Sequence, residues 1–245
     1  MIDNIRFFEA RTKVLSKDGA RGGIGTLGEK LLHRILKLYF EPCEEYHEIK
    51  YLGSVADIKN GYGITEIQTR SLEKLLPKLK RFLERERVTV VYPLISEKRL
   101  FWFDKQTGEV SEPRRSPKHG KPSDALPELS KLSELIPNEN LTVKIVLLSA
   151  DEYKSLDGWD KTGKLGATCI ERIPREITDI ITLQRREDFS RLIPESLGTE
   201  FTAKDFGKAA ALRGRRAYFS LKFLLFLGIL ERGMGCGRAY IYKRI

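Results

Sequence analysis

Cysteine is scarce in this chain of 245 residues, and long apolar runs are missing. The three cysteines, Cys43, Cys169 and Cys236, lack the CxxC spacing of a structural zinc site, and their odd number argues against a disulfide framework. No apolar run reaches the ~20 residues that a membrane-spanning helix needs. The N-terminal segment also lacks the apolar stretch of a secretion signal. We therefore expect ordinary thiols, no membrane association and a cytoplasmic location.

Acidic residues are few at the C-terminal end of the chain. The formal net charge is +10, and residues 201–245 hold ten Lys and Arg against Asp205 and Glu231, which leaves +8 in this segment. A basic chain without a membrane segment most often binds a polyanion. The charge distribution therefore favours nucleic acid as the partner.

Two amphipathic helices are predicted by apolar residues at helical spacing. The first starts at Thr26, a suitable N-cap, and runs to residue 40. The second follows Ser71, also a suitable N-cap, and covers residues 72–87. Pro77 lies inside this second pattern and is expected to kink it.

Short stretches separated by Gly-Ser and Asn-Gly-Tyr-Gly predict an antiparallel meander of three strands between residues 46 and 70. Apolar runs at 88–95 and 141–148 predict strands of the core. The order helix, three strands, helix, strand is typical of an α/β fold with a mixed central sheet flanked by helices. The connecting elements that we expect are a polar hairpin at 104–108, an exposed basic loop at 112–123, a long loop at 157–169, a strand at 176–183 and a short helix at 186–198.

Three polar residues of the meander could carry chemistry. Asp57 lies on the second strand. Glu66 and Gln68 lie two residues apart on the third strand, so these two side chains point to the same face of the sheet. A turn at Asn60 brings Asp57 toward the same region. Two neighbouring carboxylates repel each other, and Mg²⁺ relieves the repulsion while it polarises a phosphate and activates water. The alternative is that these side chains form the solvated face of an antiparallel sheet.

At these residues the chain resembles the PD-(D/E)XK nuclease superfamily, over roughly residues 20–150. That family combines the element order above with an acid on the second strand, acid-x-lysine on the third and often a glutamate on the first helix. The resemblance implies Asp57 as the first acid, Glu66 as the second and Glu29 as the helix glutamate. It also implies Mg²⁺ or Mn²⁺ held by Asp57 and Glu66. Alternatively, Glu29 pairs with Lys30 or His33 on an exposed helix face.

The sequence departs from the family at the lysine, which is Gln68 here. A glutamine amide orients water but supplies no charge. Some restriction enzymes of the family resemble this chain in having glutamine at that position. Lys59 and Arg70 fall on matching faces by strand alternation, and either could supply the missing charge.

The C-terminal segment has the pattern of a small basic module. Thr202 is expected to cap a helix over 203–212, a second helix runs from about 216 to 227, and two strands flank the glycine-rich GMGCG. This pattern resembles winged helix-turn-helix domains, in which the second helix enters the major groove of DNA. The candidates for groove, phosphate or wing contacts are Arg215, Arg216, Tyr218, Ser220, Lys222, Arg232 and Arg238. Four apolar residues at helical spacing are expected in its core: Phe219, Phe223, Leu224 and Phe226.

We therefore expect two domains: a nuclease over residues 1–194 and a winged helix over 195–245. The expected function is metal-dependent cleavage of double-stranded DNA, with further phosphate contacts from the basic loop. A restriction-type endonuclease is the favoured version, and a repair or mobile-element nuclease is the next. One alternative is a non-catalytic DNA-binding protein with a degenerate nuclease fold. Another is a transcription regulator that senses a small ligand. A homodimer is left open.

Overall fold

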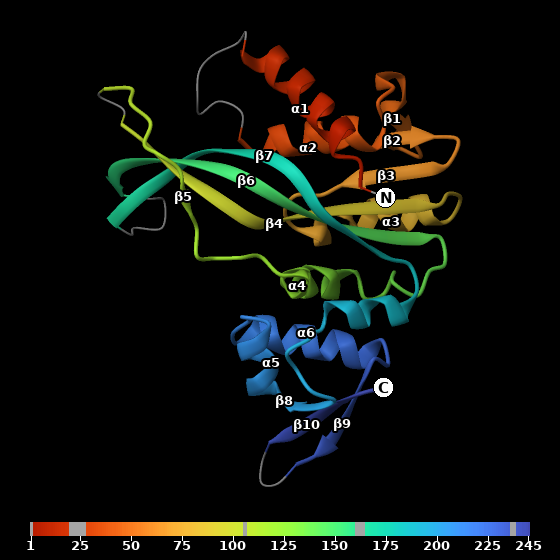
Figure 1. Ribbon diagram of the computed structural model, residues 1–245. Helices are drawn as coiled ribbons and strands as arrows, with labels where there is room; N and C mark the ends of the chain where they lie inside the picture. The colour runs from red at the N-terminus through yellow and green to blue at the C-terminus, as the bar shows by residue number, and fades with distance from the viewer. Residues whose placement is uncertain (1, 20–27, 105–106, 160–164, 236–238) are drawn as a thin grey trace. The chain divides into compact units, whose positions relative to one another are not determined.

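The computed structural model describes residues 2–19, 28–104, 107–159, 165–235 and 239–245. The side chains of residues 18–19, 28–30, 156–159 and 165–168 lie outside this description. The fold is mixed α/β, with a central mixed sheet flanked by helices (Figure 1). None of the helices in these segments combines the length and the apolar character that crossing a membrane requires.

Contacts divide the chain into two compact units, each assembled from three separate stretches. Unit 1 comprises Met1–His47, Ile95–Gly120 and Val146–Ile180, and unit 2 comprises Glu48–Leu94, Lys121–Ile145 and Ile181–Ile245. The strands that contribute to both units are β4 (Val88–Phe103), β6 (Leu141–Trp159) and β7 (Leu165–Leu183). The domain boundary expected at residue 195 lies within unit 2 and stays a prediction.

The sheet has the strand order β1-β2-β3-β4-β6-β7, with β5 (Arg114–Arg115) paired to β4. The first three strands, β1 (His47–Tyr51), β2 (Ser54–Asn60) and β3 (Gly63–Ile67), are the expected meander. β2 is antiparallel to β3, whereas β3 is parallel to β4, so the sheet is mixed. The turn between Asn60 and Gly63 is the one that Asn-Gly-Tyr-Gly predicts.

The long strands extend well beyond the apolar runs that predict them. The expected loop at 157–169 is wrong outside residues 160–164, because β6 continues to Trp159 and β7 begins at Leu165. Residues 160–164 lie outside the described residues. The described side chains of these extensions include many charged groups, which pair with partners on neighbouring strands. Apolar periodicity does not register such pairing.

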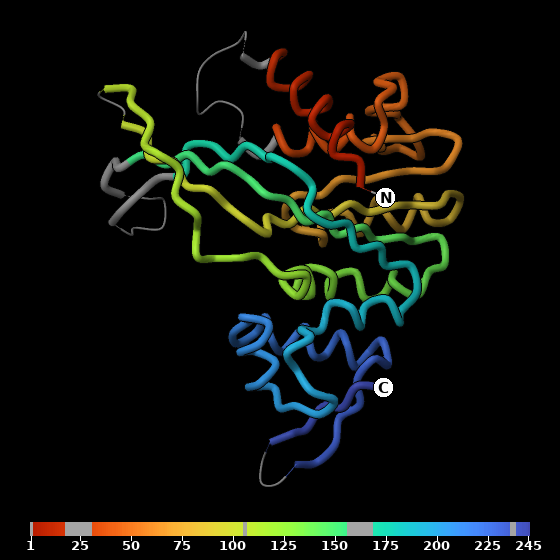
Figure 2. Tube along the Cα trace, in the orientation of Figure 1, coloured from red at the N-terminus to blue at the C-terminus, as the bar shows by residue number. Residues whose placement is uncertain are grey.

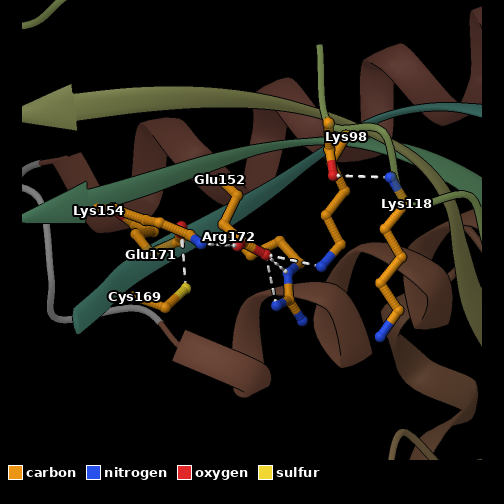
Figure 3. A network of polar contacts seen from close by, with 8 residues as sticks. Lys98, Lys118, Glu152, Lys154, Cys169, Glu171 and Arg172 are labelled. Carbon is orange, nitrogen blue, oxygen red and sulfur yellow. Dashed lines mark hydrogen bonds and ion pairs between the residues drawn. The ribbon is translucent and has the colours of Figure 1, made fainter. Parts of the chain in front are cut away.

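One such pairing surrounds Glu152 on β6, within unit 1 (Figure 3). Its Oε2 accepts hydrogen bonds from Lys98 Nζ at 3.0 Å and from Arg172 Nη2 at 2.6 Å. Its Oε1 lies 3.3 Å from Lys154 Nζ. Burial alone would raise the pKa of Glu152, but hydrogen bonds from Arg172 and Lys98 outweigh it and hold the pKa at about 2. The network stabilises the charged carboxylate.

Two helices pack together in unit 1, α1 (Asn4–Gly19) and α2 (Gly28–Phe40), before the short η1 (Glu44–Tyr46). Asn4 donates to the Ile177 carbonyl at 3.2 Å and accepts from the Ile177 amide at 3.0 Å, which fixes α1 against β7. The sequence predicts α2 but not α1. Exposed apolar residues on α1 blur the stripe that would indicate it.

The segment after β3 starts as η2 (Leu72–Leu75) and continues as α3 (Leu76–Leu83), not as the single longer helix that we expect. Pro77 lies in the first turn of α3, where its missing N–H loses no hydrogen bond, so it begins a helix rather than kinking one. Ser71 makes no side-chain cap. Instead, its carbonyl accepts a hydrogen bond from Gln68 Nε2 at 2.7 Å.

The last part of unit 2 consists of β8 (Glu200–Thr202), α5 (Ala203–Ala209), α6 (Arg215–Phe226), β9 (Leu230–Met234) and β10 (Tyr240–Arg244). Its strands form an antiparallel sheet in the order β8-β10-β9. Thr202 caps α5 in a reciprocal capping box with Asp205, which confirms the predicted cap. After α6, Gly228 has a φ of 67° and ends the helix.

Unit 2 also contains short helices: η3 (Pro122–Ala125), α4 (Leu126–Leu129), η4 (Ser130–Leu132) and η5 (Arg186–Leu192). Contacts of α4 and η4 with α6 join the C-terminal part to the rest of this unit. α4 and α6 lie side by side (Figure 2). Phe189 of η5 packs edge-on against Phe223 of α6, with ring centroids 5.6 Å apart. The C-terminal helices therefore share a core with the remainder of unit 2.

Glu152→Gln should destabilise the protein at neutral pH. The folded pKa of Glu152 is about 2, below the ordinary glutamate value of 4.5, so its charge contributes stability above pH 4.5 that is lost as pH falls toward 2. We expect a loss of roughly 1–3 kcal/mol at pH 7 that shrinks below pH 4. Urea denaturation at both pH values measures it. Glu187→Gln, on an exposed pair, is the control and should change stability little. Equal effects of the two variants at pH 7 would contradict the prediction.

Candidate functional site

Asp57 and Glu66 face each other across the β2–β3 hairpin. The register pairs Ile58 with Thr65, which puts Asp57 opposite Glu66 one step further along. Asp57 Oδ2 accepts from the Ile67 amide at 2.8 Å, and Glu66 Oε1 accepts from the Asp57 amide at 3.3 Å. The structure thus brings together the two acids that the expected turn at Asn60 places in one region.

The Glu66 carboxylate is buried, with 1% of its side chain exposed. Lys78, from α3, lies with its Nζ 2.6 Å from Glu66 Oε2. Burial, followed by the nearby charge of Asp57, raises the pKa of Glu66 to about 7, although Lys78 opposes the rise. Near neutral pH the site therefore holds a carboxyl group that exchanges its proton readily.

Lys78 is the site residue that sequence analysis missed. It lies between Leu75 and Phe82, three residues after one and four before the other, and thus within the apolar stripe of this segment. The feature of the sequence that could have indicated Lys78 is a charged residue at a helix position that should face the sheet. The ammonium group is still partly accessible, because 21% of the side chain is exposed.

Lys59 and Arg70 are the two cations expected to compensate for the family lysine. Lys59 pairs with Glu86 at 2.9 Å and lies over the Tyr51 ring at 4.5 Å, and its expected role in supplying the missing charge stays a prediction. Arg70 lies past the end of β3 and is exposed. The described cation in contact with Glu66 is Lys78, which lies on α3.

The other two expected site residues differ in what the structure describes. Gln68 follows β3 and donates through its side-chain amide to the Ser71 carbonyl, so it fixes the turn into η2. Glu29 is the second residue of α2, and its side chain lies outside the described residues. Its expected role therefore stays a prediction.

The acidic donors described at this site are Asp57 and Glu66. Among the side chains that the structure describes, no three His, Cys, Asp or Glu gather into a metal-binding group. Mg²⁺ commonly uses one or two carboxylates and completes its shell with water and substrate phosphates. In this structure Glu66 Oε1 accepts from the Asp57 amide and Glu66 Oε2 from Lys78, so a cation would replace one of these contacts, and the metal site stays a prediction.

Comparison with known proteins places the chain in a family. A family model described as "Domain of unknown function (DUF8091)" matches residues 30–184. The chain belongs to this family. An uncharacterized protein of Treponema pallidum (strain Nichols) is 27% identical over 222 residues, which cover 90% of this chain and 87% of that protein. No solved structure gives a significant match.

The DUF8091 segment contains Asp57, Glu66 and Lys78, whereas residues 185–245 lie outside it. The similarity to the Treponema protein covers 90% of the chain, so it extends beyond the DUF8091 segment. The carboxylate site is therefore part of the family domain. The similarity to the Treponema protein also includes residues outside this domain.

Four of the residues expected to contact nucleic acid are exposed on α6: Arg215, Arg216, Tyr218 and Lys222. Ser220 is a correction to the expected set, because it is fully buried and its Oγ donates to the Arg216 carbonyl at 2.8 Å. On β9, the guanidinium of Arg232 lies 4.4 Å from the ring centroid of Tyr240. Arg238 lies outside the described residues.

The expected core of α6 is only half right. Phe223 and Leu224 are buried, but Phe219 and Phe226 are 48% and 59% exposed. The buried pair and the exposed pair both fit helical spacing, so spacing alone does not predict which pair packs against α5 and α4. The outer surface of α6 therefore carries aromatic rings beside its cations.

Glu66→Gln should stabilise the protein at alkaline pH. The folded pKa of about 7 exceeds the ordinary glutamate value of 4.5, so the wild type loses stability as pH rises from 4.5 to 7. We expect the variant to be more stable by roughly 1–3 kcal/mol at pH 8 and nearly equal to wild type at pH 4. Urea denaturation at both pH values checks this. A variant less stable than wild type at pH 8 would refute the raised pKa of Glu66.

Proposed function

We propose that this chain is a metal-dependent endonuclease of the PD-(D/E)XK type that hydrolyses phosphodiester bonds in DNA. The observation that carries the proposal is the buried Glu66 carboxylate, opposed by Asp57 and contacted by Lys78. A carboxyl group with a strongly raised pKa beside a second acid is typical of a functional site. A buried ion pair contributes little to stability on average, because the cost of desolvation offsets the attraction between the charges.

The side chains have separable roles in this proposal. Asp57 and Glu66 hold the cation, which supplies positive charge to polarise the phosphate and lower the pKa of water. Lys78 supplies the fixed charge that Gln68 lacks, and its partly exposed ammonium group can donate to a phosphate oxygen. Gln68 positions the turn that precedes η2 and α3.

The order of elements supports the proposal. α2, the meander β1-β2-β3, α3 and the parallel neighbour β4 follow one another as the resemblance implies. The acids lie on the second and third strands of the meander, also as it implies. The lysine differs, because here it comes from the helix after the third strand.

The C-terminal part of unit 2 supports duplex binding. Its order β8-α5-α6-β9-β10, with an antiparallel sheet, resembles that of winged-helix domains, in which the second helix lies in the major groove. The +8 charge of residues 201–245 suits a phosphate backbone. In this proposal α6 holds the duplex and the Asp57–Glu66 pair cuts it.

Cleavage of plasmid DNA should require Mg²⁺ or Mn²⁺ and should vanish in Asp57→Asn and Glu66→Gln, because each removes a metal-ligand charge. Lys78→Met should lower the cleavage rate by on the order of 10²-fold, because it removes a fixed charge beside the phosphate. Gel assays of nicked and linear plasmid measure the rates.

Lys80→Ala is the matched control for Lys78, because Lys80 lies on the same helix but pairs with exposed Glu134. It should leave the rate unchanged. If wild-type protein with Mn²⁺ cuts no duplex, single strand or junction, the chain is instead a non-catalytic DNA-binding protein.

Binding of duplex DNA by the full chain in EDTA should weaken in the double variant Arg215→Ala with Lys222→Ala. Both side chains are exposed on α6, and loss of each phosphate contact should reduce the log–log salt slope by about 1. Fluorescence anisotropy at several salt concentrations measures this. Lys13→Ala, where the amine pairs with Glu44, is the control. An unchanged slope in the double variant would assign α6 to a protein partner.

A further inference from the structure

A polar groove lies in unit 2 where the β2–β3 turn meets the starts of β4 and β6. Its larger part is a cavity of about 690 Å³ lined by residues that include Tyr62, Arg87 and Thr142. A second cavity of about 350 Å³ shares Glu139, Gln184 and Arg185 with the first and extends to Phe226. The two neighbouring cavities are called here the arginine groove.

The turn fixes one wall of the arginine groove. Asn60 Oδ1 accepts from the Tyr62 amide at 2.9 Å, and the Ile64 amide donates to the Arg87 carbonyl at 2.9 Å. Gly63 has a φ of 126°, and a Cβ there would lie 2.4 Å from the Arg87 carbonyl oxygen. The close approach requires glycine, and it holds Tyr62 beside Arg87.

Hydrogen bonds also fix the opposite wall. Asp188 Oδ2 accepts from the Gln184 amide at 2.9 Å and from the Arg185 amide at 2.8 Å at the start of η5. The Val88 amide donates to the Asn140 carbonyl at 2.8 Å, which joins the start of β4 to the residue before β6. The groove therefore exists before any ligand arrives.

The chemistry of the lining favours a polyanion. Arg87 and Arg185 are exposed, hydroxyl and amide groups lie between them, and Glu139 is the acid of the lining. Sites for apolar small molecules are lined mainly by hydrophobic side chains, which is not the case in the larger cavity. The smaller cavity is more apolar, with Ile136, Pro137, Phe226 and Leu227 beside Arg185 and Arg186. Phosphate groups match arginines and neutral donors.

Two aromatic rings at the groove narrow the choice of polyanion. Tyr62 is 92% exposed at the β2–β3 turn, and Phe226 is 59% exposed at the end of α6. Exposed rings beside a basic groove stack on unpaired bases, whereas bases within a duplex cannot reach them.

We propose that the arginine groove binds single-stranded nucleic acid, with phosphates against Arg87 and Arg185 and bases against Tyr62 and Phe226. Val88 of the groove and Val90, the partner of Glu66, are two residues apart on β4, about 7 Å along the strand. The groove therefore lies near the carboxylate pair. Guiding a single strand to that pair rests on the proposed function, but binding in the groove does not.

The test is fluorescence anisotropy of the full chain with labelled dT20 in EDTA, so that cleavage plays no part. Arg87→Ala with Arg185→Ala should weaken dT20 binding at least tenfold and reduce the salt slope by about 1.4. Tyr62→Ala with Phe226→Ala should weaken dT20 binding at least tenfold but leave an abasic oligomer of equal length unaffected. An rU20 arm distinguishes RNA from DNA, and either polymer supports the proposal.

The controls separate this proposal from the nuclease. Lys13→Ala and Tyr46→Ala remove an exposed cation and an exposed ring elsewhere and should leave binding unchanged. Asp57→Asn should bind dT20 like wild type even if it cuts nothing. Wild-type affinity in both groove variants overturns the proposal, whatever the cleavage result. Equal loss of duplex and dT20 binding, with no effect of the ring variant, also overturns it, because the groove would then be a duplex contact.

Discussion

The burial of the Glu66 carboxylate constrains both the register of the β2–β3 hairpin and the position of α3. A carboxylate with 1% of its side chain exposed loses most of its hydration, and that cost must be offset by nearby donors or by a proton. Here the donors are the Asp57 amide and the Lys78 ammonium group. Both depend on the β2–β3 register and on the start of α3 at the right distance. A change in either would leave a buried charge without compensation.

Glu66 and Glu152 show why burial alone does not indicate function. Both carboxylates are almost fully buried, yet Glu152 has contacts from three cations and a pKa of about 2. Its neighbour Asp151 is held by Arg99 in two hydrogen bonds of 2.7 and 2.8 Å. Glu66 instead contacts one described cation, Lys78, and burial together with the charge of Asp57 raises its pKa to about 7. A carboxyl group of this kind can bind a proton or a cation near neutral pH.

The local parts of this arrangement follow from sequence, whereas the long-range parts do not. The turn at Asn60, the cap at Thr202 and the shared face of Asp57 and Glu66 depend on residues within ten positions, so spacing predicts them. The contact of Lys78 with Glu66 depends on how α3 packs on the sheet. The polar extensions of β6 and β7 depend on pairing across strands. Apolar periodicity carries no information about either.

The packing of the C-terminal helices changes how nucleic-acid binding should be understood. A tethered module would raise the local concentration of DNA through its linker. Here the contact of Phe189 with Phe223, and the hydrogen bonds from Arg244 to the Pro194 and Leu197 carbonyls, hold this part within unit 2. Phe226 lies on the outer surface of α6 and also lines the arginine groove. A duplex on α6 and a single strand in the groove would therefore meet at one residue, so the two proposed contacts suit a substrate in which duplex and unpaired strand adjoin.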